Sequence, residues 1–161
     1  ASRADRGGFV VRLANGYRLK VKGDEYLRVH RLVSRVTPLA LWESMAEGDD
    51  LDAIRREIPE EFYDDFDTIR AALTHRFVDV VSATEDAHAA RCDVSDKDVG
   101  LALASIPQPA RQFIFARRKH GPTWHALPKF RNDVCRVFRP TANVLAGYSP
   151  SAAMHRFADD A

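Results

Sequence analysis

Three basic residues, Arg18, Lys20 and Lys22, occupy alternate positions near the start of the chain. Side chains at alternate positions of a β-strand lie on one face, so this spacing predicts a row of positive charge along a single strand face. Lysines held side by side in this way are suited to neutralising charge on phosphate oxygens. The alternative is a solvated basic surface, which is the usual role of lysines on an exposed strand.

The strand that carries these residues is predicted to be the second of a hairpin. Apolar side chains alternate with others over residues 9–14 and 17–22, and the dipeptide Asn15-Gly16 separates the two runs. Asn-Gly favours a tight type I′ turn, and alternation on both sides of it is typical of an antiparallel β-hairpin. A lone hairpin is at best marginally stable in water, so we expect a larger sheet beside it.

From Asp24 onward the sequence pattern is helical. Thr37-Pro38 is typical of a helix start. Pro59 opens the longest apolar stripe, whose residues recur at spacings of three and four: Phe62, Phe66, Ile69, Leu73, Phe77 and Val81. Further helices are expected near residues 96–105, 110–120 and 127–138, whereas residues 141–161 are expected to be partly loose.

The predicted fold is therefore mainly α, in two parts. Residues 1–23 are expected to form an N-terminal antiparallel β-hairpin. Residues 24–161 are expected to form an all-helical domain of about six helices, with the boundary at Gly23.

The composition is that of a globular domain in a reducing compartment. Of the 161 residues, 45% are hydrophobic and 29% are charged. No apolar run approaches the roughly 18 residues that a bilayer span requires, and the chain shows no basic-then-apolar leader. Cys92 and Cys135 are too few for a disulfide framework. We therefore expect a cytoplasmic protein with reduced cysteines and no membrane partner.

Charge is unevenly distributed, although the net charge is only +1. Residues 1–36 hold nine Lys and Arg against three Asp and Glu, residues 37–98 hold six against seventeen, and residues 99–161 hold nine against three. Two basic ends around an acidic middle indicate an anionic partner at the basic parts. Mutual attraction between the segments within one fold explains the same pattern equally well.

The motifs at the start of the chain resemble the end of the adenylyltransferase domain of phage-type, T4 RNA ligase 1-like ATP-dependent RNA ligases, members of the covalent nucleotidyltransferase superfamily. The residues that carry the resemblance are GGFV at 7–10, KVK at 20–22 and EYLRVHR at 25–31, in the order and spacing of that family. A weaker similarity continues through residues 41–66. The resemblance implies that the hairpin is the last piece of a nucleotidyltransferase sheet.

Enzymes of this family transfer AMP from ATP to a lysine, pass it to an RNA 5′-phosphate and then join that end to a 3′-hydroxyl. The resemblance implies that Lys20 and Lys22 are catalytic and nucleotide-binding residues that contact the phosphates of the nucleotide. It also implies ATP and Mg²⁺ as cofactors of the intact enzyme, and RNA as its substrate. The helical C-terminal domain of the family is expected to help select the RNA, particularly tRNA.

Two departures from the family pattern limit what this chain is expected to do alone. The family has a glutamate where this chain has Gly7, and glycine has no side chain to hold a metal or a nucleotide. The nucleophilic lysine of an upstream Lys-x-x-Gly motif is also missing, because the Lys-x-x-Gly at residues 20–23 belongs to the later KVK motif. We expect an inactive C-terminal portion that works with an N-terminal catalytic domain in the same or another chain.

The helical part contains a second candidate for contacts with RNA. Arg117, Arg118 and Lys119 lie at a predicted helix end, close to His120 and Trp124. Basic side chains bind phosphates, and an exposed tryptophan can stack on a base. The alternatives are that the basic residues complement the helix dipole and that Trp124 belongs to the core.

Neither a metal site nor a nucleophilic cysteine is expected in this chain. No pair of His or Cys residues has the spacing of zinc ligands, and Cys92 and Cys135 are both predicted to be buried on helix faces.

Two further functions fit the same residues. One is a non-catalytic RNA-binding or interaction module derived from such a ligase, which Gly7 favours. The other is a structural helical domain that packs against a separate catalytic chain.

Overall fold

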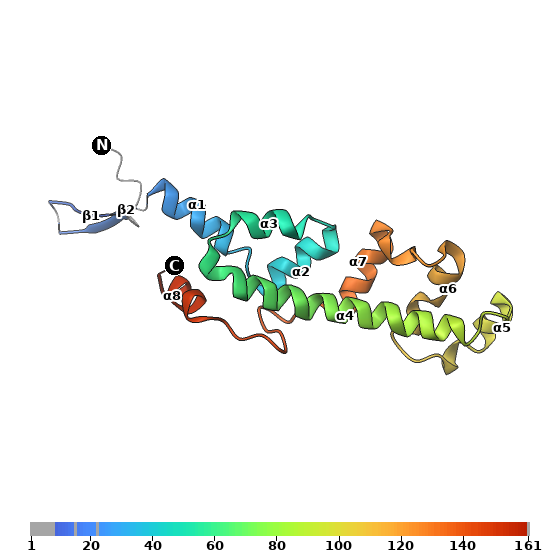
Figure 1. Ribbon diagram of the computed structural model, residues 1–161. Helices are drawn as coiled ribbons and strands as arrows, with labels where there is room; N and C mark the ends of the chain where they lie inside the picture. The colour runs from blue at the N-terminus through green and yellow to red at the C-terminus, as the bar shows by residue number, and fades with distance from the viewer. Residues whose placement is uncertain (1–8, 15, 22, 161) are drawn as a thin grey trace.

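A computed structural model describes residues 9–14, 16–21 and 23–160 of the chain (Figure 1). Two short strands come first, β1 (Phe9–Arg12) and β2 (Arg18–Val21). Eight α-helices follow in the described part: α1 (Asp24–Val33), α2 (Pro38–Glu47), α3 (Leu51–Glu57), α4 (Tyr63–Ala89), α5 (Asp96–Leu101), α6 (Ala110–His120), α7 (Pro128–Val137) and α8 (Ala152–Asp160). The predicted mainly α class is confirmed, with more helices than the sequence pattern indicated.

Helix α4 is the central helix against which much of the helical part packs. It spans 27 residues, with α2 and α3 along its first half, α6 and α7 along its second half, and α1 and α5 near its two ends (Figure 1). The apolar stripe predicted for it faces the core, where Phe66, Ile69 and Leu73 are at most 1% exposed. Because burying a side chain of this size contributes about 1.5–3 kcal/mol, this stripe explains why the other helices collect around α4.

Capping residues set the starts of the shorter helices. The Thr37 hydroxyl accepts a hydrogen bond from the amide of Ala40 at 3.2 Å, and Pro38 occupies the first turn of α2. Asp50 caps α3, and Ser95 caps α5. These side chains satisfy amides that a helix leaves unpaired at its N-terminus, so the local sequence determines where each helix begins.

Gly48 ends α2 and makes room for a contact with α7. Its φ of +82° lies in the left-handed region that glycine tolerates. The Arg131 guanidinium from α7 donates to the carbonyl oxygen of Glu47 at 2.7 Å. A Cβ atom at residue 48 would lie 2.4 Å from Cζ of Arg131. The glycine therefore serves both the helix end and the packing of α7 on α2.

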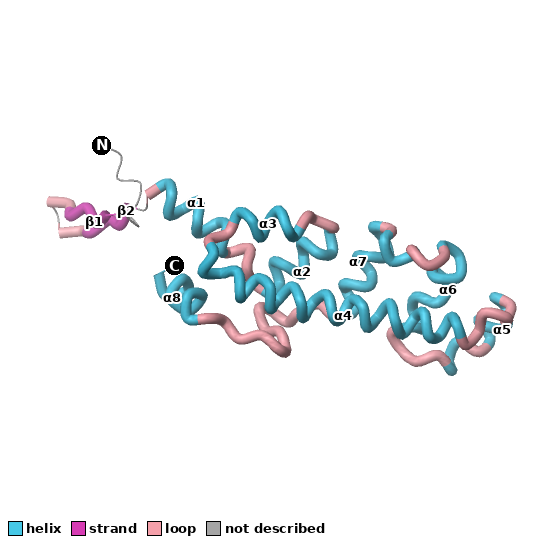
Figure 2. Tube along the Cα trace, in the orientation of Figure 1, coloured by secondary structure: helices cyan, strands magenta, loops and turns pink. Residues whose placement is uncertain are grey.

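The C-terminal segment is more ordered than the sequence pattern indicated. After α7 the chain runs back toward the α1 end of the molecule and forms α8 (Figure 2). The segment is anchored by Asp65, a carboxylate only 2% exposed in the first turn of α4. Asp65 accepts hydrogen bonds from the Tyr148 hydroxyl at 3.0 Å, the Ser151 amide at 2.9 Å and the Ser151 hydroxyl at 2.5 Å. Burial raises the pKa of Tyr148 well above its usual range, and its bond to Asp65 acts in the same direction.

The two strands pair antiparallel at the N-terminal end of α1, apart from the helices (Figure 1). In their register Phe9 lies opposite Val21, and Arg12 lies opposite Arg18. Gly16 has a φ of +85° between the strands, whereas Asn15 lies outside the described residues. Val10 and Tyr17 are 57% and 73% exposed. Within the described part of the chain, no third strand pairs with these two.

None of the helices in the described residues combines the length and the apolar character that crossing a bilayer requires.

Candidate nucleic-acid interface

The structure places one of the two predicted catalytic lysines. Lys20 lies in β2, where its backbone is paired with Val10 of β1. Lys22 and Gly7 lie outside the described residues. The shared strand face for Lys20 and Lys22 therefore stays a prediction.

A cross-strand pair of arginines concentrates positive charge on the hairpin. Arg12 of β1 and Arg18 of β2 are direct register partners, and both are exposed. Like charges directly opposite each other on a sheet repel and destabilise it. An anion bound near the two guanidinium groups would relieve that repulsion, so this end of the hairpin favours an anionic partner.

A pocket of about 430 Å³ opens between α1, the first helix after the hairpin, and α3. It is lined by Arg28, Arg31 and Leu32 from α1 and by Arg56 and Glu57 from α3, a set that we call the arginine pocket. Arg28 and Arg31 are one helical turn apart, which places them on one side of α1. The sequence could have shown that pairing, but not the approach of α3, which depends on tertiary packing.

The three arginines of the arginine pocket differ in how closely an acidic residue approaches them. Glu25 accepts two hydrogen bonds from the Arg28 guanidinium, at 2.6 and 2.9 Å, and the bond to Arg28 holds the pKa of Glu25 below its usual range. Asp50 lies 3.9 Å from Arg56, at the outer limit of an ion pair. Arg31 has no ion pair within the described residues, so it can accept a new anionic partner without losing one.

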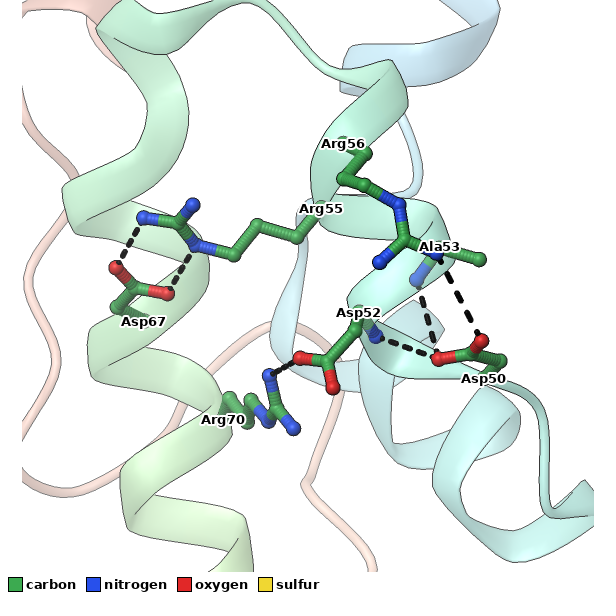
Figure 3. A network of polar contacts seen from close by, with 7 residues as sticks. All are labelled: Asp50, Asp52, Ala53, Arg55, Arg56, Asp67 and Arg70. Carbon is green, nitrogen blue, oxygen red and sulfur yellow. Dashed lines mark hydrogen bonds and ion pairs between the residues drawn. The ribbon is translucent and has the colours of Figure 1, made fainter.

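The neighbouring arginines on α3 and α4 differ from those of the pocket because they hold the helices together. Arg55 reaches from α3 to α4 and donates to both carboxylate oxygens of Asp67, at 2.7 and 2.8 Å (Figure 3). Arg70 of α4 reaches back to Asp52 at 2.6 Å. The hydrogen bonds from these arginines lower the pKa values of Asp67 and Asp52. These ion pairs hold α3 against α4. Arg56 is then the arginine of α3 that does not contact α4.

The basic end of α6 is engaged mainly in internal contacts. Arg117 donates to Glu85 of α4 at 2.7 Å, and its side chain is 16% exposed. Arg118 pairs with Asp96 at 2.5 Å and donates to the Arg91 carbonyl oxygen at 3.0 Å. Lys119 is exposed. Of the three residues predicted to contact RNA here, Lys119 is therefore the one whose charge faces solvent.

Trp124 belongs to the core, as the alternative interpretation held. It is fully buried, and its ring stacks on that of Phe113 with 5.3 Å between centroids. Its Nε1 donates to Glu85 at 3.3 Å. Because Trp124 is enclosed by other side chains, the idea that it stacks on a base as an exposed residue is wrong.

We expect Arg117→Ala to lower the free energy of unfolding by about 1–2 kcal/mol, because it leaves a half-buried carboxylate without its charged donor. Lys119→Ala is the matched control on the same helix end, and its expected change is below about 0.5 kcal/mol. Urea denaturation followed by circular dichroism measures both. Equal losses in the two variants would contradict the internal role of Arg117.

The cysteines differ in their surroundings. Cys135 is buried, and desolvation raises the pKa of its thiol to about 11, which makes it a poor nucleophile. Cys92 is exposed, so the prediction that both cysteines are buried is wrong for Cys92, which lies in the turn after α4. Among the residues that the structure describes, no group of three His, Cys, Asp or Glu side chains is arranged to hold a metal ion.

Comparison of this chain with known protein families, with curated proteins and with solved structures finds no match.

Proposed function

We propose that this chain is the C-terminal part of an ATP-dependent RNA ligase of the phage type. Such an enzyme joins RNA 5′-phosphate and 3′-hydroxyl ends through enzyme–AMP and RNA–adenylate intermediates. The observation that carries the proposal is the ordered series of motifs GGFV, KVK and EYLRVHR over residues 7–31. In this proposal the hairpin completes the adenylyltransferase sheet, and the helices from α1 onward bind RNA, with tRNA as the candidate substrate.

The exposure of the hairpin supports the first half of this proposal. A two-stranded hairpin is marginally stable by itself, and this one leaves Val10 and Tyr17 largely exposed. Packing against the sheet of an adenylyltransferase domain would cover such residues. In the intact enzyme, that domain would hold ATP and Mg²⁺, with Lys20 and Lys22 beside the nucleotide phosphates.

The placement of the basic residues supports RNA as the partner. Exposed arginines occur both on the hairpin, at Arg12 and Arg18, and on the helices beyond it, at Arg31 of α1 and Arg56 of α3. Arginines bind phosphate oxygens through several donors at once. A strand of RNA that lies along this end of the molecule would meet them in succession.

RNA binding by the chain tests the proposal directly. We expect a fluorescein-labelled, 5′-phosphorylated RNA to bind, as measured by fluorescence anisotropy. The logarithm of the association constant should fall linearly with the logarithm of salt concentration, with a slope of about 0.7 per phosphate contact for a single strand. An absence of binding to both tRNA and single-stranded RNA at low salt would contradict the proposal.

The chain alone is expected not to form a covalent bond with AMP, because it lacks the nucleophilic lysine. Incubation with radiolabelled ATP and Mg²⁺, followed by a denaturing gel, measures this. A label that stays with the protein would show that a lysine of this chain is the nucleophile.

Gly7 favours a second candidate, a non-catalytic RNA-binding or interaction module derived from such a ligase. Glycine at this position offers no carboxylate to a metal or a nucleotide. The coding sequence upstream of Ala1 distinguishes the two candidates. A continuous reading frame with a Lys-x-x-Gly motif in a strand-rich context supports the ligase, and a start codon at that point supports the module.

A further inference from the structure

We infer that the arginine pocket between α1 and α3 is a binding site for backbone phosphates of RNA, with Arg31 and Arg56 as the principal contacts. This inference rests on the proposed function and adds to it the residues that hold the strand. It differs from the sequence-based expectation, which placed RNA contacts at Arg117, Arg118 and Lys119.

The geometry of the pocket suits a phosphate of a polymer. Three arginines from two different helices line one opening of about 430 Å³. The opening is larger than a phosphate group, and the side chain of Leu32 adds an apolar surface on which a ribose can lie. The carboxylate of Glu57 also lines the pocket, which disfavours a compact, highly charged polyphosphate relative to a phosphodiester with one negative charge.

The ion pairs of the molecule separate Arg31 and Arg56 from the other arginines, including Arg28 of the same pocket, which Glu25 contacts at 2.6 Å. Arg55, Arg70 and Arg117 each have a carboxylate within 2.7 Å. By contrast, Arg56 lies 3.9 Å from Asp50, and Arg31 has no ion pair within the described residues. Binding of a phosphate at Arg31 and Arg56 would therefore break no close ion pair, whereas binding at the other three would.

The position of the pocket agrees with a path for RNA toward the hairpin. Helix α1 begins at Asp24, three residues after β2 ends at Val21. Arg28 and Arg31 therefore lie one to two helical turns from the strand that carries Lys20. The Arg12–Arg18 pair lies farther along this path, at the turn end of the hairpin.

The test compares variants of the full chain in the anisotropy experiment with a short 5′-phosphorylated single-stranded RNA. For Arg31→Ala/Arg56→Ala we expect the salt slope to fall by about 1.4, since each lost contact removes about 0.7. Arg136→Ala is the control: Arg136 is 69% exposed on α7 and lies 3.5 Å from Asp133, so its slope should equal that of the wild type. Glu57→Gln removes a negative charge from the pocket and should tighten binding.

Each outcome decides a different point. Wild-type binding with an unchanged slope in the double variant overturns this inference and leaves the proposed function intact. An absence of wild-type binding to this RNA overturns this inference, and an absence of binding to tRNA as well overturns both. Inorganic tripolyphosphate separates the two sources of phosphate: if it displaces RNA from the wild type at an equal concentration of phosphate groups, the pocket takes a nucleotide-like phosphate chain and the assignment to RNA is wrong.

Discussion

Replacing Lys20 or Lys22 by alanine in the complete ligase is expected to lower the rate of RNA sealing about a hundredfold or more. If both lysines contact the transferring phosphate, each stabilises charge that develops in the transition state. Loss of one such contact in a site that excludes water typically costs roughly 3–4 kcal/mol. The experiment requires the proposed adenylyltransferase domain upstream of this chain, with glutamate in place of Gly7, and a nicked or single-stranded RNA substrate.

Arg18→Ala is the control for this experiment. Arg18 belongs to the same strand as Lys20 but lies nearer the turn and outside the KVK motif, so its replacement should cost far less activity. The melting temperature of Arg18→Ala should stay close to that of the parent, because Arg18 is exposed and exposed residues contribute little to stability. The same result is expected for the two lysine variants. Equal losses of activity in the three variants would mean that the strand is only a basic surface.

The parts of the fold that could be predicted from the sequence are those that depend on neighbouring residues. Thr37, Asp50 and Ser95 start helices because each satisfies amides within its own turn. The apolar spacing of three and four predicted α4 and its buried face for the same reason. The C-terminal segment is rich in alanine and contains Gly147 and Pro150, which by themselves indicate a partly loose tail. Its helix α8 depends on contacts with distant residues, among them His30 of α1 and Phe62, and these cannot be read from the local sequence.

The arginine pocket could not be predicted from the sequence, because the positive charge of an arginine does not show which residue its side chain contacts in the fold. Arg55 and Arg56 are adjacent in the sequence, but about 100° of helical rotation separates their side chains. Figure 3 shows Arg55 reaching Asp67 on α4, whereas Arg56 points away from α4 toward Asp50. Arg56 also borders the pocket beside α1. The same limit applied at Arg117, whose partner Glu85 lies 32 residues away.

Asp65 is the site where a single change should loosen the C-terminal segment. Its carboxylate accepts three hydrogen bonds from Tyr148 and Ser151, and it is almost fully buried. In Asp65→Ala these donors lose a charged acceptor in a poorly hydrated place, and hydrogen bonds to charged groups contribute about 1.5–3 kcal/mol each. Because Tyr148 and Ser151 are only half-buried, water can replace part of that loss. We expect a total destabilisation of about 3 kcal/mol.

For a chain of this size, such a loss lowers the melting temperature by roughly 6–12 °C. Asp64→Ala is the matched control, because Asp64 also carries a negative charge in the first turn of α4 but is exposed. Its removal should cost only the helix-dipole contribution of about 0.3–1 kcal/mol. Phe157 of α8 packs against Phe62 and His30, and the segment that leads to α8 is anchored by Asp65. Limited proteolysis should therefore cut residues 141–160 faster in Asp65→Ala than in Asp64→Ala. Similar melting temperatures and cleavage rates in the two variants would show that α8 is held by its apolar contacts alone.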